Sequence, residues 1–152
     1  MFIIAILLRK GEEAMSHDKA AILIKKAALV IEKMSNHVLA PYELTNTQYK
    51  ILMLLYRNPG RPIRQIDIEA HFAMTNPTVT GIIQNLERKG LVQRLQNPDD
   101  KRSKLLALTE QAVPMVQELH ALGESLEKQV TAKLTEDESR QLIVLLKKML
   151  AD

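Results

Sequence analysis

The sequence contains no cysteine and no tryptophan, and aromatic residues make up only 3% of its 152 positions. Without cysteine, the chain cannot form disulfide bonds, use a thiolate nucleophile or bind zinc through sulfur. The hydrophobic fraction of 46% is nevertheless typical of a globular protein. We therefore expect an aliphatic core that includes methionine, in a chain long enough for one domain with additional arms.

Sequence motifs of the common enzyme classes are also missing. The chain has no HExxH motif, no phosphate-binding or dinucleotide-binding glycine loop and no serine elbow. Its four histidines are scattered at His17, His37, His71 and His120. We expect a protein that is not an enzyme and has no cofactor. A metal-sensing site of histidine and carboxylate ligands remains an alternative, because such a site needs no cysteine, although no spacing points to one.

The N-terminal segment predicts neither a membrane anchor nor a signal peptide. Its apolar run of eight residues is shorter than the roughly 20 that span a bilayer, and basic residues follow the run instead of preceding it. Ser16 or Asp18 can cap a helix that begins just after Met15. We expect residues 1–14 to be a leader, either disordered or upstream of the true start, and we expect a cytoplasmic protein with no membrane partner.

Helical periodicity covers most of the remaining chain. We expect helices over residues 19–38, 46–57, 63–72, 77–89, 110–130 and 135–150. Capping boxes over residues 45–48 and 135–138 mark two of the starts. Asn76 is predicted to cap the helix that has Pro77 at its first position, and Pro114 is expected to kink or delay the fifth helix. The buried side of the third helix is expected to hold Ile63, Ile66 and Ala70.

Between the fourth and fifth helices the pattern changes to that of a β-hairpin. Residues 91–95 and 104–108 are the predicted strands, and a charged turn over residues 96–103 separates them. The segment 88–104 carries six basic residues against two acidic ones, which suits contact with phosphates. The order of elements indicates a mainly α fold with a small β-hairpin wing, a winged helix-turn-helix.

The helix over residues 77–89 carries the functional prediction. Its apolar residues recur at helical spacing and define one buried face, whereas its other face is polar and has no carboxylate before Glu87. Amides and guanidinium groups are suited to reading base edges in a major groove. The residues predicted to contact DNA are Thr75, Asn76, Pro77, Thr78, Thr80, Gly81, Gln84, Asn85, Arg88, Lys89, Arg94, Lys101, Arg102 and Lys104. For an isolated helix, a merely solvated polar face would be the simpler interpretation.

The same segments resemble the MarR family of transcriptional regulators. The matching stretches are Thr78-Val79-Thr80, Leu86 to Arg94, Pro98 to Lys104 and Leu108-Thr109-Glu110. The resemblance implies that Asp100 braces the hairpin while Arg102 enters the minor groove, where narrow A·T-rich segments attract arginine. The departures from the family pattern are Gly81, Gln84 and Asn85, where many relatives are basic, and Gln111-Ala112 in the turn after Glu110, where a glycine is common. We therefore expect affinity to depend more on the wing, with a moderate salt dependence.

The resemblance also implies an obligate homodimer that binds double-stranded DNA. The first helix and the last two offer more aliphatic surface than one small core can cover. We expect dimerisation helices over residues 15–40 and 110–152 and a DNA-binding lobe over residues 41–109. Two recognition helices related by a two-fold axis would bind a pseudo-palindromic operator with half-sites about 34 Å apart, and the expected role is that of a repressor.

Members of this family often bind small aromatic or anionic effectors between the dimerisation helices and the DNA-binding lobe. The residues of this chain that would line such a crevice are Met34, His37, Tyr42, Tyr49 and Met53. Ordinary core and interface packing is the alternative for each of them. Release of DNA by an effector would require different affinities for two states of the dimer. A winged protein-interaction module remains the second functional alternative.

Overall fold

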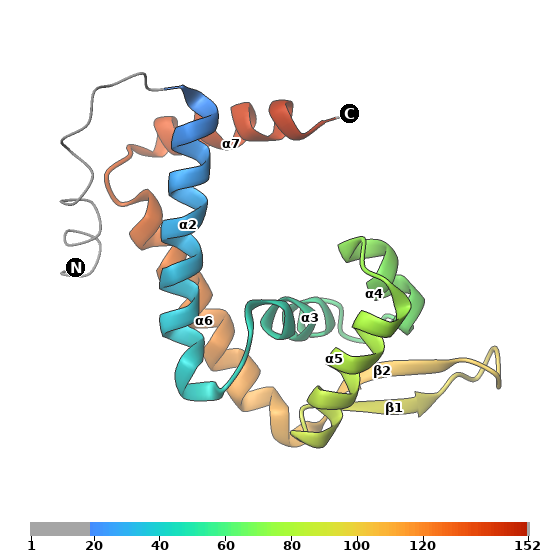
Figure 1. Cartoon of the computed structure of the whole chain (residues 1–152). Helices are drawn as coiled ribbons and strands as arrows, with labels where there is room; N and C mark the ends of the chain where they lie inside the picture. The colour runs from blue at the N-terminus through green and yellow to red at the C-terminus, as the bar shows by residue number, and fades with distance from the viewer. Residues whose placement is uncertain (1–18, 152) are drawn as a thin grey trace.

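The computed structural model describes residues 19–151, which are mainly helical with a two-stranded antiparallel sheet (Figure 1). The elements are α2 (Ala20–Leu39), η1 (Ala40–Tyr42), α3 (Asn46–Tyr56), α4 (Gln65–Phe72), α5 (Asn76–Arg88), β1 (Val92–Gln96), β2 (Lys104–Leu108), η2 (Glu110–Ala112), α6 (Val113–Thr131) and α7 (Glu136–Leu150). The leader over residues 1–14, the start expected at Met15 and the caps expected at Ser16 and Asp18 lie outside the described residues.

The elements form two arms that meet at an angle (Figure 1). One arm consists of α2, α6 and α7, and the other consists of α3, α4, α5 and the hairpin of β1 and β2. The N-terminal end of α6 lies at the corner between the arms, and the hairpin points away from the helices. In the described part of the chain, no helix combines the length and the apolarity that crossing a bilayer requires.

The core lies in the arm that carries the hairpin. Its fully buried side chains come from α3, α4, α5 and α6, and they are Ile51, Leu52, Ile68, Val79, Ile83, Leu86, Val116 and Leu119. Burying each such aliphatic side chain contributes about 1.5–3 kcal/mol relative to leaving it in water. Because Val116 and Leu119 belong to the first half of α6, one continuous helix joins this core to the other arm.

The predicted helix caps at Thr45 and Thr135 are confirmed. The Thr45 hydroxyl accepts a hydrogen bond from the backbone N–H of Gln48 at 3.2 Å, and Oε1 of Gln48 accepts one from the backbone N–H of Thr45 at 3.0 Å. Thr135 forms the same reciprocal pair with Glu138. The Glu138 carboxylate accepts hydrogen bonds from the backbone N–H and the hydroxyl of Thr135, and these two bonds lower its pKa. Pro114 delays α6 without kinking it, because the turn η2 precedes the helix and places proline in its first turn, where no amide hydrogen is needed.

The predicted burial of α4 is wrong at Ile66 and Ala70. Ile66 is 59% exposed and Ala70 is also exposed, whereas Ile68 is fully buried. The cause lies just before the helix, where the backbone of Ile63 pairs with the sheet: its carbonyl accepts a hydrogen bond from the N–H of Leu106 at 2.8 Å. Helix α4 therefore begins two residues later than expected, and a different face turns to the core.

The start of α5 also differs from the prediction. Thr75, in an extended conformation, is the residue that precedes the helix, and its carbonyl accepts from the N–H of Val79 at 3.1 Å. Asn76 is the first helical residue instead of the cap, and Pro77 follows it in the first turn. The Asn76 side chain does not bond to its own helix, because it donates to Oε1 of Glu69 in α4 at 2.7 Å.

Removing the hydroxyl of Thr45 is expected to destabilise the protein, because the N–H of Gln48 loses its acceptor at the start of α3. The Thr45→Ala variant should lose about 1 kcal/mol of unfolding free energy, measured by urea denaturation followed by circular dichroism. Thr47→Ala is the matched control, since the Thr47 side chain takes no part in the capping box, and it should stay within about 0.5 kcal/mol of the parent. Equal losses in the two variants would contradict a capping role.

Candidate nucleic-acid interface

Helix α5 has one buried apolar face and one exposed polar face. Val79, Ile83 and Leu86 are fully buried and fix the rotation of the helix against the core. The residues around the polar face that are exposed are Thr75, Asn76, Pro77, Thr78, Gly81, Gln84, Arg88 and Lys89, and those that are half-buried are Thr80 and Asn85. The face predicted to contact DNA is thus presented to solvent.

The first turns of α5 are tied to α4 by side-chain amides. Gln65 donates through Nε2 to the hydroxyl of Thr80 at 2.7 Å and to Oε1 of Glu69 at 3.0 Å. The same Glu69 oxygen accepts from Asn76. Thr80 and Asn76 therefore hold the two helices of the helix-turn-helix together, a role that the sequence analysis did not assign to them.

Gly81 lies in the middle of the exposed face and is not needed for packing. A Cβ atom built at this position would meet no atom within 4 Å. Glycine costs roughly 1 kcal/mol relative to alanine inside a helix, so its presence is not explained by contacts within the chain. The space in front of the Gly81 backbone is open to a ligand that approaches α5 closely.

Asn85 is held by a residue of another helix. Nε2 of Gln48, at the start of α3, donates to Oδ1 of Asn85 at 2.8 Å. Gln48 is buried and Asn85 is half-buried. A bidentate contact with adenine, which would need both the oxygen and the nitrogen of the amide, is therefore not available to Asn85 in this arrangement.

The tip of the wing exposes its basic residues on a turn that is ordered by hydrogen bonds. The Arg102 side chain is 95% exposed, and Lys101 is exposed as well. Oδ1 of Asp100 accepts from the backbone N–H of Arg102 at 3.0 Å and lies 3.6 Å from its Nε. The buried Asn97, which sequence reasoning missed, donates to the Ser103 hydroxyl at 2.7 Å. The sequence signal that could have identified Asn97 is its position at the start of an Asn-Pro-Asp-Asp turn.

Three other predicted contact residues already bind protein atoms. Nε of Arg94 in β1 lies 3.1 Å from Oε1 of Glu87 in α5, and this ion pair connects the wing to the recognition helix. Lys89 donates to the backbone carbonyl of Glu43, and Lys104 donates to Oε1 of Gln96. These cations contribute positive potential near α5 and the hairpin, but their side chains also serve the fold.

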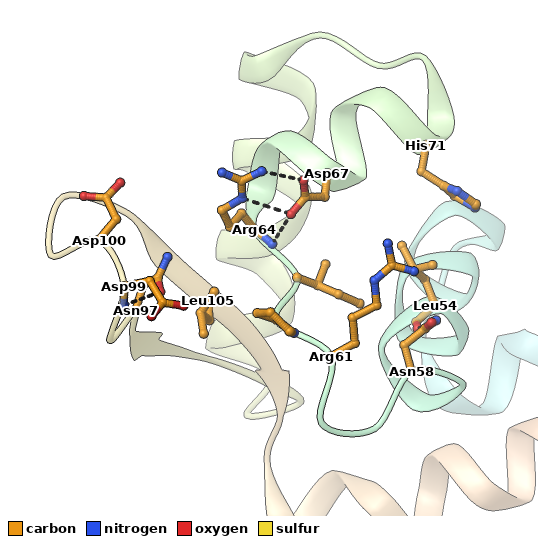
Figure 2. Close-up of a pocket in the computed structure, with 12 residues that line it drawn as sticks. Leu54, Asn58, Arg61, Arg64, Asp67, His71, Asn97, Asp99, Asp100 and Leu105 are labelled. Atoms are coloured by element: carbon orange, nitrogen blue, oxygen red, sulfur yellow. Dashed lines mark hydrogen bonds and ion pairs between the residues drawn. The ribbon is translucent and has the colours of Figure 1, made fainter.

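A cavity of about 510 Å³ lies between the end of α3, the start of α4 and the turn of the wing (Figure 2). Arg64 closes one side of it by holding Asp67 through Nε at 3.1 Å and through Nη2 at 3.0 Å (Figure 2). These hydrogen bonds lower the pKa of Asp67 and raise the pKa of Arg64. Asp100 also lines the cavity, so the ion pair and the wing turn are neighbours. The Arg64–Asp67 ion pair was not predicted from the sequence, and it caps the start of α4.

The candidate effector residues lie where α2 and α3 approach α6. Met34 and Met53 are buried, Tyr42 and Tyr49 are half-buried, and His37 is exposed. A hydrogen bond with Glu118 of α6 raises the pKa of Tyr42, and burial raises that of Tyr49.

The Tyr49 hydroxyl lies so close to Gly123 of α6 that a Cβ there would collide with it. The cavity beside the wing and a second one under the hairpin are lined by other residues. Among residues 19–151, no three His, Asp or Glu side chains are grouped as a metal ion would require.

Comparisons of sequence agree with this geometry. The model of the MarR family matches residues 44–104, which include α3, α4, α5 and β1. The chain is 32% identical over 120 residues to the multiple antibiotic resistance protein MarR of Escherichia coli strain K12, covering 78% of this chain and 82% of that protein. It is 34% identical over 115 residues to YwoH, an uncharacterized HTH-type transcriptional regulator of Bacillus subtilis strain 168, covering 76% and 82%.

Comparisons of structure lead to the same group of proteins. The S. aureus MepR–DNA complex matches with a TM-score of 0.78 and 27% identity, covering 90% of this chain and 98% of that chain. A mutant of E. coli MarR in complex with operator DNA matches with a TM-score of 0.75 and 30% identity, covering 86% and 93%. Because sequence and fold agree over most of the chain, the protein belongs to the MarR family.

Proposed function

We propose that the protein is a transcriptional regulator that binds a pseudo-palindromic operator in double-stranded DNA as a homodimer. The observation that carries the proposal is the exposed polar face of α5 beside a wing tip whose Arg102 side chain is 95% exposed. The base-reading groups and the phosphate-contacting groups thus stand on adjacent elements of one core. MepR and MarR structures that contain DNA are similar to this chain over 90% and 86% of its length.

The residues of the proposed interface divide into two kinds. Gln84, Asn85 and Thr78 on α5 are neutral and suited to base edges. Arg88, Lys101 and Arg102 are cationic and suited to phosphates or to a narrow minor groove. Asp100 supports this arrangement, since it engages the backbone of Arg102 and leaves the guanidinium exposed.

The homodimer is proposed from the unpaired aliphatic surface of the arm that lacks the wing. Exposed aliphatic side chains on α2 and α7 are Ile22, Leu23, Ile24, Leu29, Leu142, Ile143, Val144, Leu145, Met149 and Leu150. A surface of this kind marks a protein interface, and α2 and α7 belong to the same arm (Figure 1). Residues 15–40 and 110–152 are therefore the proposed dimerisation segments, and residues 41–109 the proposed DNA-binding lobe.

The remaining parts of the proposal follow from this role. The protein acts on DNA without catalysing a reaction, and it works in the cytoplasm, where a bacterial-type regulator meets its operator. It represses transcription when the operator overlaps a promoter, because the bound dimer and RNA polymerase then exclude each other. Reporter assays with and without the protein test the direction of regulation.

An effector site is proposed where Tyr42 and Tyr49 approach α6. A small aromatic acid bound there would separate α3 from α6 and change the spacing of the two recognition helices, which requires different affinities for the two dimer states. Titration with benzoate as the probe should lower operator affinity in the parent protein and do so less in Tyr49→Phe, which lacks the hydroxyl. Equal responses in both proteins would contradict a site at Tyr49.

Selection from a genomic duplex library tests the operator itself. The purified protein should enrich a short inverted repeat whose half-sites are centred about one helical turn, roughly 34 Å, apart. Sedimentation of the purified protein should give the mass of two chains. If no sequence is enriched and no duplex binds even at low salt, the DNA-binding proposal fails and a protein-interaction module becomes the better interpretation.

Replacing Arg102 is expected to weaken operator binding broadly, because the lost guanidinium contacts the backbone or the minor groove and not a single base. Arg102→Ala should lose affinity for all enriched sequences and reduce the salt slope by about one unit if the contact is to a phosphate. Binding is measured by fluorescence anisotropy at two salt concentrations. The matched control is Arg57→Ala, since Arg57 is also an exposed arginine but lies beside Glu124 of α6. Equal losses in the two variants would argue against a wing contact.

A further inference from the structure

The orientation of the Gln48 side chain is fixed by chemistry. The backbone N–H of Thr45 can only donate, so the atom of Gln48 that lies 3.0 Å from it must be the carbonyl oxygen Oε1. The other end of the Gln48 amide is therefore the NH₂ group. That group can only donate as well, and it lies 2.8 Å from Asn85. The capping box of α3 thus determines which end of Gln48 faces the recognition helix.

The orientation of Asn85 follows from that of Gln48. Because Gln48 presents a donor, the Asn85 atom facing it must be the acceptor Oδ1. Within residues 19–151, Nδ2 of Asn85 forms no hydrogen bond, and no buried side-chain nitrogen or oxygen in this region lacks a partner. Nδ2 must therefore reach solvent. It does so on the face of α5 that also carries Gly81 and Arg88, four residues before and three residues after Asn85.

We propose that Gln48 is a positioning residue that makes Asn85 a hydrogen-bond donor toward the major groove and so selects guanine at one position of each half-site. The inference rests on the proposed operator binding. In the major groove guanine presents two adjacent acceptors, N7 and O6, and thymine presents one, O4, whereas adenine pairs an acceptor with a donor and cytosine presents a donor. The two protons of the Asn85 NH₂ group are therefore matched best by guanine. With its own oxygen held by Gln48, Asn85 matches guanine and mismatches the amino groups of adenine and cytosine.

The direct test changes Gln48, which the proposal keeps away from the bases. In Gln48→Glu the carboxylate still accepts from the Thr45 N–H, because glutamate serves at this position of a capping box, and the start of a helix favours its negative charge. The glutamate has no donor for Asn85. Asn85 must then turn its NH₂ group inward and present Oδ1 to the groove, which reverses the hydrogen-bonding character of its exposed end.

Operator selection is run with the parent and with Gln48→Glu, after circular dichroism shows that the variant is folded. The position read by Asn85 is the one at which Asn85→Ala loses its base preference. The parent should prefer guanine over adenine and cytosine there by roughly fivefold or more, and Gln48→Glu should prefer adenine or cytosine over guanine. Asn85→Asp should change the preference in the same direction, because one carboxylate oxygen accepts from Gln48 and the other faces the groove. This second variant decides the matter if Gln48→Glu does not fold.

The control separates orientation from charge. Gln117→Glu makes the same chemical change at an exposed position of α6 and should leave every base preference unaltered. If the parent enriches an operator but Gln48→Glu and Asn85→Asp keep guanine and only bind more weakly, the positioning role is wrong while the regulator function stands. The inference also fails if Asn85→Ala alters no position. If the parent enriches no operator at all, it is the proposed function that fails.

Discussion

The burial of three aliphatic side chains of α5 is the constraint on which the rest of the interface depends. Val79, Ile83 and Leu86 are completely removed from water, and exposing any of them by rotating the helix would cost about 1.5–3 kcal/mol each. The rotation of α5 is therefore set by the core and not by its polar residues. The residues on the opposite side of the helix are therefore presented to solvent, and Gly81 and Gln84 are among them.

Polar contacts then adjust what this face offers. Gln65 and Glu69 of α4 engage Thr80 and Asn76, and Gln48 of α3 engages Asn85. Thr80, Asn76 and Asn85 are residue types suited to base contacts, but each has one hydrogen-bonding group occupied by a neighbouring helix. The groups that α5 can offer to DNA are thus only those that its neighbouring helices have not already bound. The ion pair of Arg94 with Glu87 likewise connects the wing strand to this helix.

The sequence was sufficient for the elements whose signals are local. The capping boxes of α3 and α7, the hairpin and the apolar stripe of α5 each depend on residues within a few positions of one another. The prediction from sequence was wrong where a residue distant in the chain determines the local structure. Ile66 is an example, because its exposure follows from the pairing of Ile63 with Leu106. The bond between Gln48 and Asn85 joins residues 37 positions apart. No pattern in a single sequence brings such a pair together, because the approach of α3 to α5 arises only when the core forms.

The middle of the reading face, at Gly81, Gln84 and Asn85, is neutral, and this has a consequence for specificity. Cations on a recognition helix attract phosphates at every sequence, so they strengthen specific and non-specific binding together. Amide and hydroxyl groups behave differently, because they lose their hydrogen bonds to water when DNA binds. Only a matching base edge replaces those hydrogen bonds, and a mismatched base leaves the group without a partner. A chain with Gly81, Gln84 and Asn85 on its reading face, and with a 95% exposed arginine side chain at the wing tip, therefore assigns attraction to the wing and to Arg88 at the end of α5, and discrimination to the neutral middle of α5. Its overall affinity should respond to salt through the wing and Arg88, whereas its preference among operators should change little with salt.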